Sequence, residues 1–318
     1  MGGMSTDWRR SRSYDFSDDD SVTRRTSRDY SREDKREYTG AISSGIETPV
    51  GKDIKSNSKL VEILVVDVTG SMREWPKLIF EKIPTLYNEA NVALQGLDLD
   101  ELKKGKKEPE NTLEMSVIAI GDAYTDRCPL QVVDFSKGAD LVKGVDQIFP
   151  EGAGGDFGRE SYELVAYYLL NHCKTPKVPK GAKPVLVFAC DEDFYKKVKP
   201  SHVKKLIGDD IGQSLDSDKL MKELAEKFDV YVLRPEPLGP DPVYEGAQKH
   251  WESLLGPQRV MKMQDPGRLV DCVIGISGYA SDNFQLGKDL LKRRQKPEQV
   301  AEVLKILHPL SNEEKGGE

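Results

Sequence analysis

The chain has 318 residues and a formal net charge of −7, with 32% charged and 37% hydrophobic residues. This length allows one large domain with appendages, or two small domains. No apolar run reaches the roughly 18 residues of a membrane-spanning helix, and the acidic balance argues against non-specific nucleic-acid binding by the whole molecule. Four scattered cysteines and four histidines argue against a zinc site.

Residues 1–56 are rich in Ser, Thr, Arg and Asp and hold few aliphatic side chains. Such a segment cannot bury enough apolar surface to offset the entropy of ordering, so we expect a disordered tail. Alternatively, its interleaved Ser, Arg and Tyr residues form a phosphorylatable or nucleic-acid-binding arm, the one part of the chain suited to nucleic acid. The N-terminus lacks the apolar segment of a signal peptide, which favours a cytoplasmic protein.

Strand and helix patterns alternate from residue 57 onward. The run LVEILVVD at 60–67 is almost continuously aliphatic, which is typical of a strand covered on both faces in a parallel sheet. The alternation predicts an α/β fold over residues 57–282, with a Rossmann-like, doubly wound, mainly parallel sheet and helices on both faces. Strands are predicted at 60–67, 113–122, 129–135, 183–190, 229–236 and 259–263, and helices within 73–97 and at 138–149, 158–173, 200–207, 217–228, 244–255 and 266–279.

Residues 283–318 are expected to form a C-terminal helical extension of two short helices. Val300, Val303, Leu304 and Leu307 recur at helical spacing and form an apolar stripe. This stripe either packs on the domain or docks a partner, and we favour packing on the domain.

Three loops carry oxygen-bearing side chains where ligands of open α/β sheets gather, outside the carboxyl ends of the strands. In the first loop, one carboxylate and two hydroxyls suit a hard, oxygen-preferring cation, most simply Mg²⁺ at about 2.1 Å. The alternative for Ser71 is an N-cap of the following helix. The loops contain Asp67, Thr69 and Ser71, then Asp156, then Asp191.

The motifs DVTGSM, EGAGGDFGRESYEL and VLVFACDED occur in this order, the first and last at strand ends and the second at a helix start. Together they resemble the von Willebrand factor A domain family over residues 57–282. In that family the corresponding segments form a metal-ion-dependent adhesion site. The resemblance implies that Asp67, Thr69 and Ser71 match the D-x-S/T-x-S element. It implies that Asp191 is the third-loop aspartate, which acts through water or hydrogen bonds.

The second loop departs from the family's pattern. Many members supply a threonine hydroxyl there, whereas this chain has Gly154-Gly155-Asp156. Loops of this type are found among intracellular members, in which the aspartate substitutes for the threonine. Direct ligation by Asp156 is a hypothesis; an added carboxylate would tighten cation binding and weaken the attraction for an acidic partner group.

Other charged residues lie close to these motifs in the sequence. Asp122 and Asp126 either border the same rim or form a solvated loop with an Asx turn at Asp122. Arg159 and Glu160 are expected to be a surface or capping pair at the start of a helix.

Three enzyme classes are alternatives to this interpretation. A haloacid-dehalogenase-type phosphatase also begins with an aspartate after a strand, and IGDDIGQS at 207–214 resembles its late acidic motif. Against it, Thr69 stands where the general acid should be, and the sequence before Gly208 is helical and basic. A P-loop is excluded because no Lys-Ser/Thr follows GAGGDFG, and Ser71 lacks the G-x-S-x-G elbow of a serine hydrolase.

The expected function is a non-catalytic binding module whose cation bridges to a Glu or Asp of a partner protein. Mg²⁺ is the expected ion, with Mn²⁺ and Ca²⁺ as alternatives, and the acidic rim predicts a basic flank on the partner. The resemblance implies a partner such as an AAA-type ATPase or a multiprotein assembly. In the alternative, the cation only stiffens the loops, and the tail or the C-terminal helices bind the partner.

Overall fold

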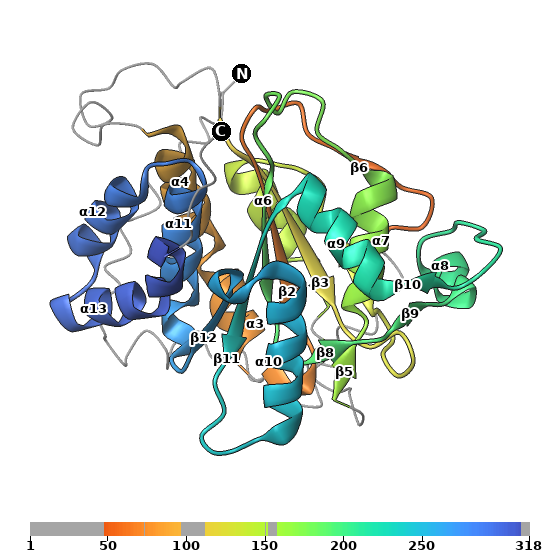
Figure 1. The fold of residues 1–318 in the computed structure, drawn as a ribbon. Coiled ribbons are helices and arrows are strands. Elements are labelled where there is room, and N and C mark those ends of the chain that lie inside the picture. Colours follow the sequence, from red (N-terminus) through yellow and green to blue (C-terminus); the bar gives the residue numbers. More distant parts are fainter. Residues whose placement is uncertain (1–47, 73, 97–111, 150, 152–157, 313–318) are drawn as a thin grey trace, which may run out of the picture.

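A six-stranded sheet lies at the centre of the molecule (Figure 1). The computed structural model describes residues 48–72, 74–96, 112–149, 151 and 158–312. All neighbouring strands of the sheet are parallel except β4, which runs antiparallel to β3 at one edge. The predicted α/β class with a mainly parallel sheet is therefore confirmed. In spatial order the strands are β12 (Val260–Met263), β11 (Asp229–Pro235), β7 (Val185–Ala189), β2 (Val61–Asp67), β3 (Glu114–Ile120) and β4 (Leu130–Val132).

Strand β2 is central, and all seven of its residues are buried. Leu64 and Val66 face one core cluster, while Ile63 and Val65 face the other. This two-sided burial explains the almost continuous aliphatic run. Glu62 and Asp67 are the acidic residues of the strand. Glu62 accepts a hydrogen bond from Ser277 Oγ at 2.8 Å, and burial raises its pKa to about 7.

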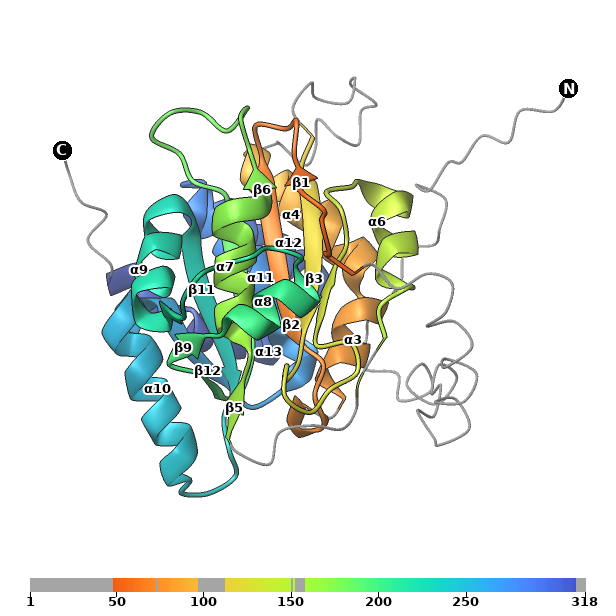
Figure 2. The same ribbon diagram turned by 90° about the vertical axis from the view of Figure 1, so that its right-hand side faces the viewer.

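Helices cover both faces of the sheet (Figure 2). The helix predicted within 73–97 is divided at Lys82, because Pro84 cannot supply a backbone donor and falls in the first turn of the second helix. No helix in the described ranges combines the length and the apolar character needed to cross a membrane. One face carries α3 (Trp75–Glu81), α4 (Ile83–Gln95), α6 (Gly138–Val145) and α11 (Leu269–Ala280), and the other α7 (Tyr162–His172), α8 (Pro200–Leu206), α9 (Ser217–Lys227) and α10 (Pro242–Leu255).

Short strand pairs tie loops to the main body. Residues 48–56, placed in the tail by the sequence, contribute β1, in which Ile54 is fully buried; residues 1–47 lie outside the described part of the chain. The pair β5–β8 joins the segment immediately before α7 to the segment after β7. The pairs are β1 (Ile54–Lys55) with β6 (Cys173–Lys174), β5 (Arg159–Glu160) with β8 (Asp193–Phe194), and β9 (Lys197–Val198) with β10 (Leu215–Asp216).

The C-terminal helices α12 (Phe284–Arg294) and α13 (Pro297–Ile306) pack on the domain (Figure 1). Val300, Val303 and Leu307 are buried in the same core cluster as α4 and α11. The apolar stripe is thus covered by the chain itself, which was the favoured interpretation.

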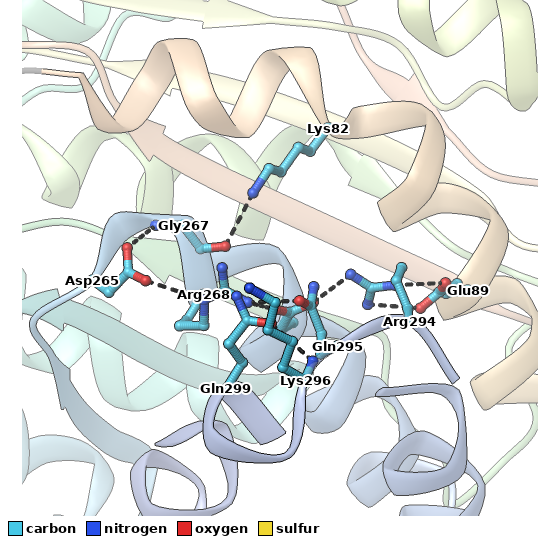
Figure 3. A network of polar contacts seen from close by, with 10 residues as sticks. Lys82, Glu89, Asp265, Gly267, Arg268, Arg294, Gln295, Lys296 and Gln299 are labelled. Carbon is cyan, nitrogen blue, oxygen red and sulfur yellow. Dashed lines mark hydrogen bonds and ion pairs between the residues drawn. The ribbon is translucent and has the colours of Figure 1, made fainter. Parts of the chain in front are cut away.

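A buried network of polar contacts holds α12 against α4 and α11 (Figure 3). The Arg294 guanidinium donates two hydrogen bonds to Glu89, both at 2.9 Å, and lies 2.6 Å from Asp271 Oδ1. Arg268 reaches the other oxygen of Asp271 at 3.1 Å and Gln295 at 2.9 Å. Asp271 is therefore a buried carboxylate whose charge is balanced by two guanidinium groups.

We expect Arg294→Ala to lower the free energy of unfolding by about 3–5 kcal/mol, because it leaves buried Asp271 and partly buried Glu89 with less compensation. Urea denaturation measures the change. Lys292→Ala is the control, since Lys292 is more than half exposed and its contact with Asp289 is 3.6 Å long; it should change stability by less than about 1 kcal/mol. Equal effects of the two substitutions would contradict this account of the network.

Candidate functional site

Asp67, the last residue of β2, is fully buried and organises the first loop. Its Oδ1 accepts the backbone N–H of Thr69 at 2.8 Å and the Thr69 hydroxyl at 2.6 Å. The hydroxyl of Tyr162, the first residue of α7, donates to Oδ2. A carboxylate has about four acceptor positions, and these contacts occupy three of them. A further side-chain hydrogen bond joins Asp67 to Asp191.

The hydroxyls of the first loop lead from Asp67 to the surface. Thr69 Oγ1 lies 3.1 Å from Ser71 Oγ. Thr69 is buried, whereas Ser71, in the short 3₁₀ helix η2 (Gly70–Met72), is exposed. The site therefore opens to solvent at Ser71.

Asp191 follows β7, the strand next to β2, and joins the same group of side chains. Burial raises its pKa, while a hydrogen bond from Ser71 and the charge of Arg234 lower it. Burial also raises the pKa of Asp67 well above its usual range, and the neighbouring Asp191 raises it further. Asp191 Oδ1 is buried without a hydrogen-bond partner in the described chain. The structure thus brings together Asp67, Thr69, Ser71 and Asp191.

Asp156 lies outside the described residues, so its predicted place in the site stays a prediction.

Arg234 supplies positive charge beside the third loop. Its guanidinium is fully buried and donates to the Asp191 carbonyl and, at 2.9 Å, to Gln248 Oε1. It also stacks on the ring of Tyr244, 4.1 Å from the centroid. Arg234 therefore positions the loop through the backbone of Asp191, and it forms no ion pair with a carboxylate within the described ranges.

Glu160 was predicted to be a surface or capping residue, and this prediction is wrong. Arg159 is exposed, but Glu160 is fully buried and neither of its carboxyl oxygens has a hydrogen-bond partner among the described residues. Burial, followed by the charges of Asp67 and Glu192, raises its pKa to about 11. The pairing of β5 with β8 explains the burial, because it carries Glu160 beneath the third loop.

Asp122 and Asp126 lie on the β3 side of the same group. Asp122 forms the predicted Asx turn, accepting the N–H of Tyr124 at 3.0 Å. It is nevertheless fully buried beside the site, so the interpretation as a solvated loop is wrong and the interpretation as a border of the site holds. A Cβ at Gly121 would collide with the Asp126 carboxylate and lie 3.4 Å from the Thr69 methyl group. Burial raises the pKa of Asp126 to about 6.

The carboxyl groups at this site are not neutralised by nearby positive charges of the described chain. Burial is the first cause of every raised pKa among them, and carboxylates near one another add to it. A divalent cation would supply the missing charge, and the carboxylate and hydroxyl oxygens fit the preference of Mg²⁺. In the described residues, no three His, Cys, Asp or Glu side chains converge to hold a metal by themselves, so a cation there needs the hydroxyls as well.

The acidic motif compared with that of a phosphatase lies away from Asp67. Asp209 accepts the Tyr167 hydroxyl at 2.7 Å and lies 2.8 Å from His172 Nε2. Tyr167 and His172 lie about one and a half and three helical turns along α7 from Tyr162, the residue that contacts Asp67.

No protein-family model and no curated protein matches the chain. Among solved structures, proximal thread matrix protein 1 from the mussel byssus is 11% identical with a TM-score of 0.43, and the match covers 74% of this chain and 50% of that one. The pilus adhesin SpaC from Lactobacillus rhamnosus GG is 11% identical, with a TM-score of 0.45 and coverages of 76% and 31%. The human COPII-coat protein Sec24c is 14% identical with a TM-score of 0.37, and the match covers 71% of this chain and 33% of that one. The match covers between 31% and 50% of the length of these proteins.

We expect Glu160→Gln to stabilise the cation-free protein increasingly as the pH rises. The folded protein keeps Glu160 protonated up to a pKa of about 11, whereas the unfolded chain releases this proton near pH 4.5. Stability is therefore lost as pH rises between these values, by up to about 1.4 kcal/mol per unit, and glutamine removes the loss. Chemical denaturation between pH 6 and 9 measures the difference in unfolding free energy between the variant and wild type. Glu226→Gln is the control, because Glu226 is exposed. A difference from wild type that does not change with pH would contradict the burial of Glu160.

Proposed function

We propose that the chain is a non-catalytic protein-binding module of the von Willebrand factor A type, in which a divalent cation bridges to a carboxylate of a partner protein. The observation that carries the proposal is the convergence of Asp67, Thr69, Ser71 and Asp191 from two distant segments. Exposed Ser71 marks the side from which a partner would approach.

The proposed cation is Mg²⁺, with Mn²⁺ and Ca²⁺ as alternatives. It would be held by Asp67, Thr69 and Ser71 with support from Asp191, and Asp156 is proposed as a further ligand. The donor set supports an oxygen-preferring ion, and the raised pKa values of Asp67 and Asp191 support the need for a positive charge.

The proposed partner is a protein with an accessible Asp or Glu, in an intracellular assembly such as one containing an AAA-type ATPase. Docking through the C-terminal stripe loses support, because Val300, Val303 and Leu307 are buried by the chain itself. If the chain were a phosphatase acting through Asp67, wild type would turn over a generic phosphomonoester faster than Asp67→Asn. We expect equal background rates.

Addition of Mg²⁺ should stabilise the wild-type protein, by about 2.7 kcal/mol at a concentration one hundred times the Kd. The double variant Asp67→Ala/Ser71→Ala should lose this gain. The matched control Ser136→Ala/Asp140→Ala removes the same two residue types near the opposite end of β3 and should keep it. Chemical denaturation with Mg²⁺ or EDTA measures the effect, and a gain of equal size in both double variants would refute the proposed ligands.

Affinity capture with mass spectrometry tests the bridging contact. Partners captured in Mg²⁺ by the wild type and by the control variant should be lost in EDTA, and lost with Asp67→Ala/Ser71→Ala. Capture of the same partners in EDTA would reject the bridge and favour the scaffold alternative, in which the cation is structural.

A further inference from the structure

A group of aromatic and basic side chains borders the candidate site on the side of α8. The ring of Tyr124, which is 44% exposed, lies 4.5 Å from the rings of both Tyr195 and His202. The Lys199 ammonium lies 4.5 Å from the Tyr124 centroid. Lys205 lies three residues after His202 on α8, so the two side chains are neighbours on one face of the helix. Burial lowers the pKa of His202, and the charges of Lys199 and Lys205 lower it further. These five residues are called the aromatic–basic face.

The lysines in and around α8 are of two kinds. The first kind is neutralised locally by an aspartate. The second kind, Lys196, Lys199 and Lys205, is exposed and has no ion pair within the described residues; of these, Lys199 and Lys205 belong to the aromatic–basic face. Positive charge is therefore left uncompensated on the side that carries the aromatic rings. The lysines of the first kind are Lys197, paired with Asp216 at 2.9 Å, and Lys204, paired with Asp210 at 2.6 Å.

The aromatic–basic face is continuous with the candidate site. The Tyr195 hydroxyl donates to Asp122 Oδ1 at 3.2 Å, and the Tyr124 N–H donates to the same oxygen at 3.0 Å. Gly121, three residues before Tyr124, is close to the Thr69 methyl group. The three residues from Gly121 to Tyr124 span at most about 11 Å. An extended peptide covers about 3.3 Å per residue, so roughly four residues of a partner would cover this span.

Two classes of anion suit exposed lysines beside aromatic rings, namely acidic protein segments and single-stranded nucleic acid. A nucleic-acid strand needs a continuous positive track for its phosphates, whereas this face has two exposed lysines without an ion pair in the described ranges. Two unpaired lysines suit a short acidic segment, which has to satisfy only a few carboxylates.

We propose that the aromatic–basic face binds an acidic segment of the partner protein, adjacent in sequence to the carboxylate that the cation takes. This inference deepens the proposed function and rests on it for the position of that first carboxylate. It also changes the expected partner. The sequence predicted a basic flank, whereas on the α8 side the structure favours an acidic one.

The test uses the full chain and a fluorescein-labelled decaglutamate peptide, with a decaglutamine peptide and a ten-nucleotide oligothymidylate of the same label as comparisons. Anisotropy is measured at low and moderate salt, in Mg²⁺ and in EDTA. Lys199→Gln/Lys205→Gln should weaken decaglutamate binding roughly threefold to tenfold, consistent with two exposed charge contacts. Lys222→Gln/Lys249→Gln, which removes two exposed lysines from α9 and α10, should leave it unchanged.

The outcomes separate this inference from the proposed function. If Lys199→Gln/Lys205→Gln weakens decaglutamate binding but EDTA and Asp67→Ala/Ser71→Ala leave it unchanged, the face binds anions and the cation bridge fails. If EDTA abolishes decaglutamate binding but Lys199→Gln/Lys205→Gln leaves it unchanged, the cation bridge stands and the binding role of the aromatic–basic face is refuted. Absence of decaglutamate binding at low salt, or tighter binding of oligothymidylate, also overturns the inference. Circular dichroism melting checks that each variant folds.

Discussion

The burial of several carboxyl groups at one edge of the sheet is the constraint on which the candidate site depends. Asp67, Asp191 and Glu160 lie near one another in a region from which water is largely excluded. Arg234 offers one guanidinium, and it is directed at a carbonyl rather than at a carboxylate. Such a group of acids is stable only when protons or a cation neutralise it, and the proposed function follows from the second possibility.

The order of the strands explains why these groups meet. Strand β2 lies between β7 and β3 and pairs in parallel with both, so residues that follow all three strands emerge at one edge. The short pair β5–β8 then adds Glu160 from the segment before α7. The same edge carries the aromatic rings beside α8, so a partner would meet a buried acidic centre and a positively charged border together.

Hydrophobic pattern and motif order were sufficient to predict the α/β class, the position of β2 and the convergence of Asp67, Thr69, Ser71 and Asp191. Strand boundaries were less accurate: the strand expected at 129–135 is reduced to β4, because pairing with β3 covers only three residues. Burial of Glu160 could not be predicted, since it arises from a two-residue strand pair without any periodic pattern. The same holds for Arg234, whose burial inside β11 depends on Tyr244 and Gln248 of α10.

The packing of α12 and α13 has a consequence for how the chain can be divided. A fragment ending at residue 282 would retain every strand of the sheet and the described part of the candidate site. It would nevertheless lose the cover of α11, whose Gly275 and Gly278 lie against Gly287 of α12, and it would lose the guanidinium between Asp271 and Glu89. The smallest fragment expected to fold by itself therefore extends to Leu310, the last buried side chain of the core.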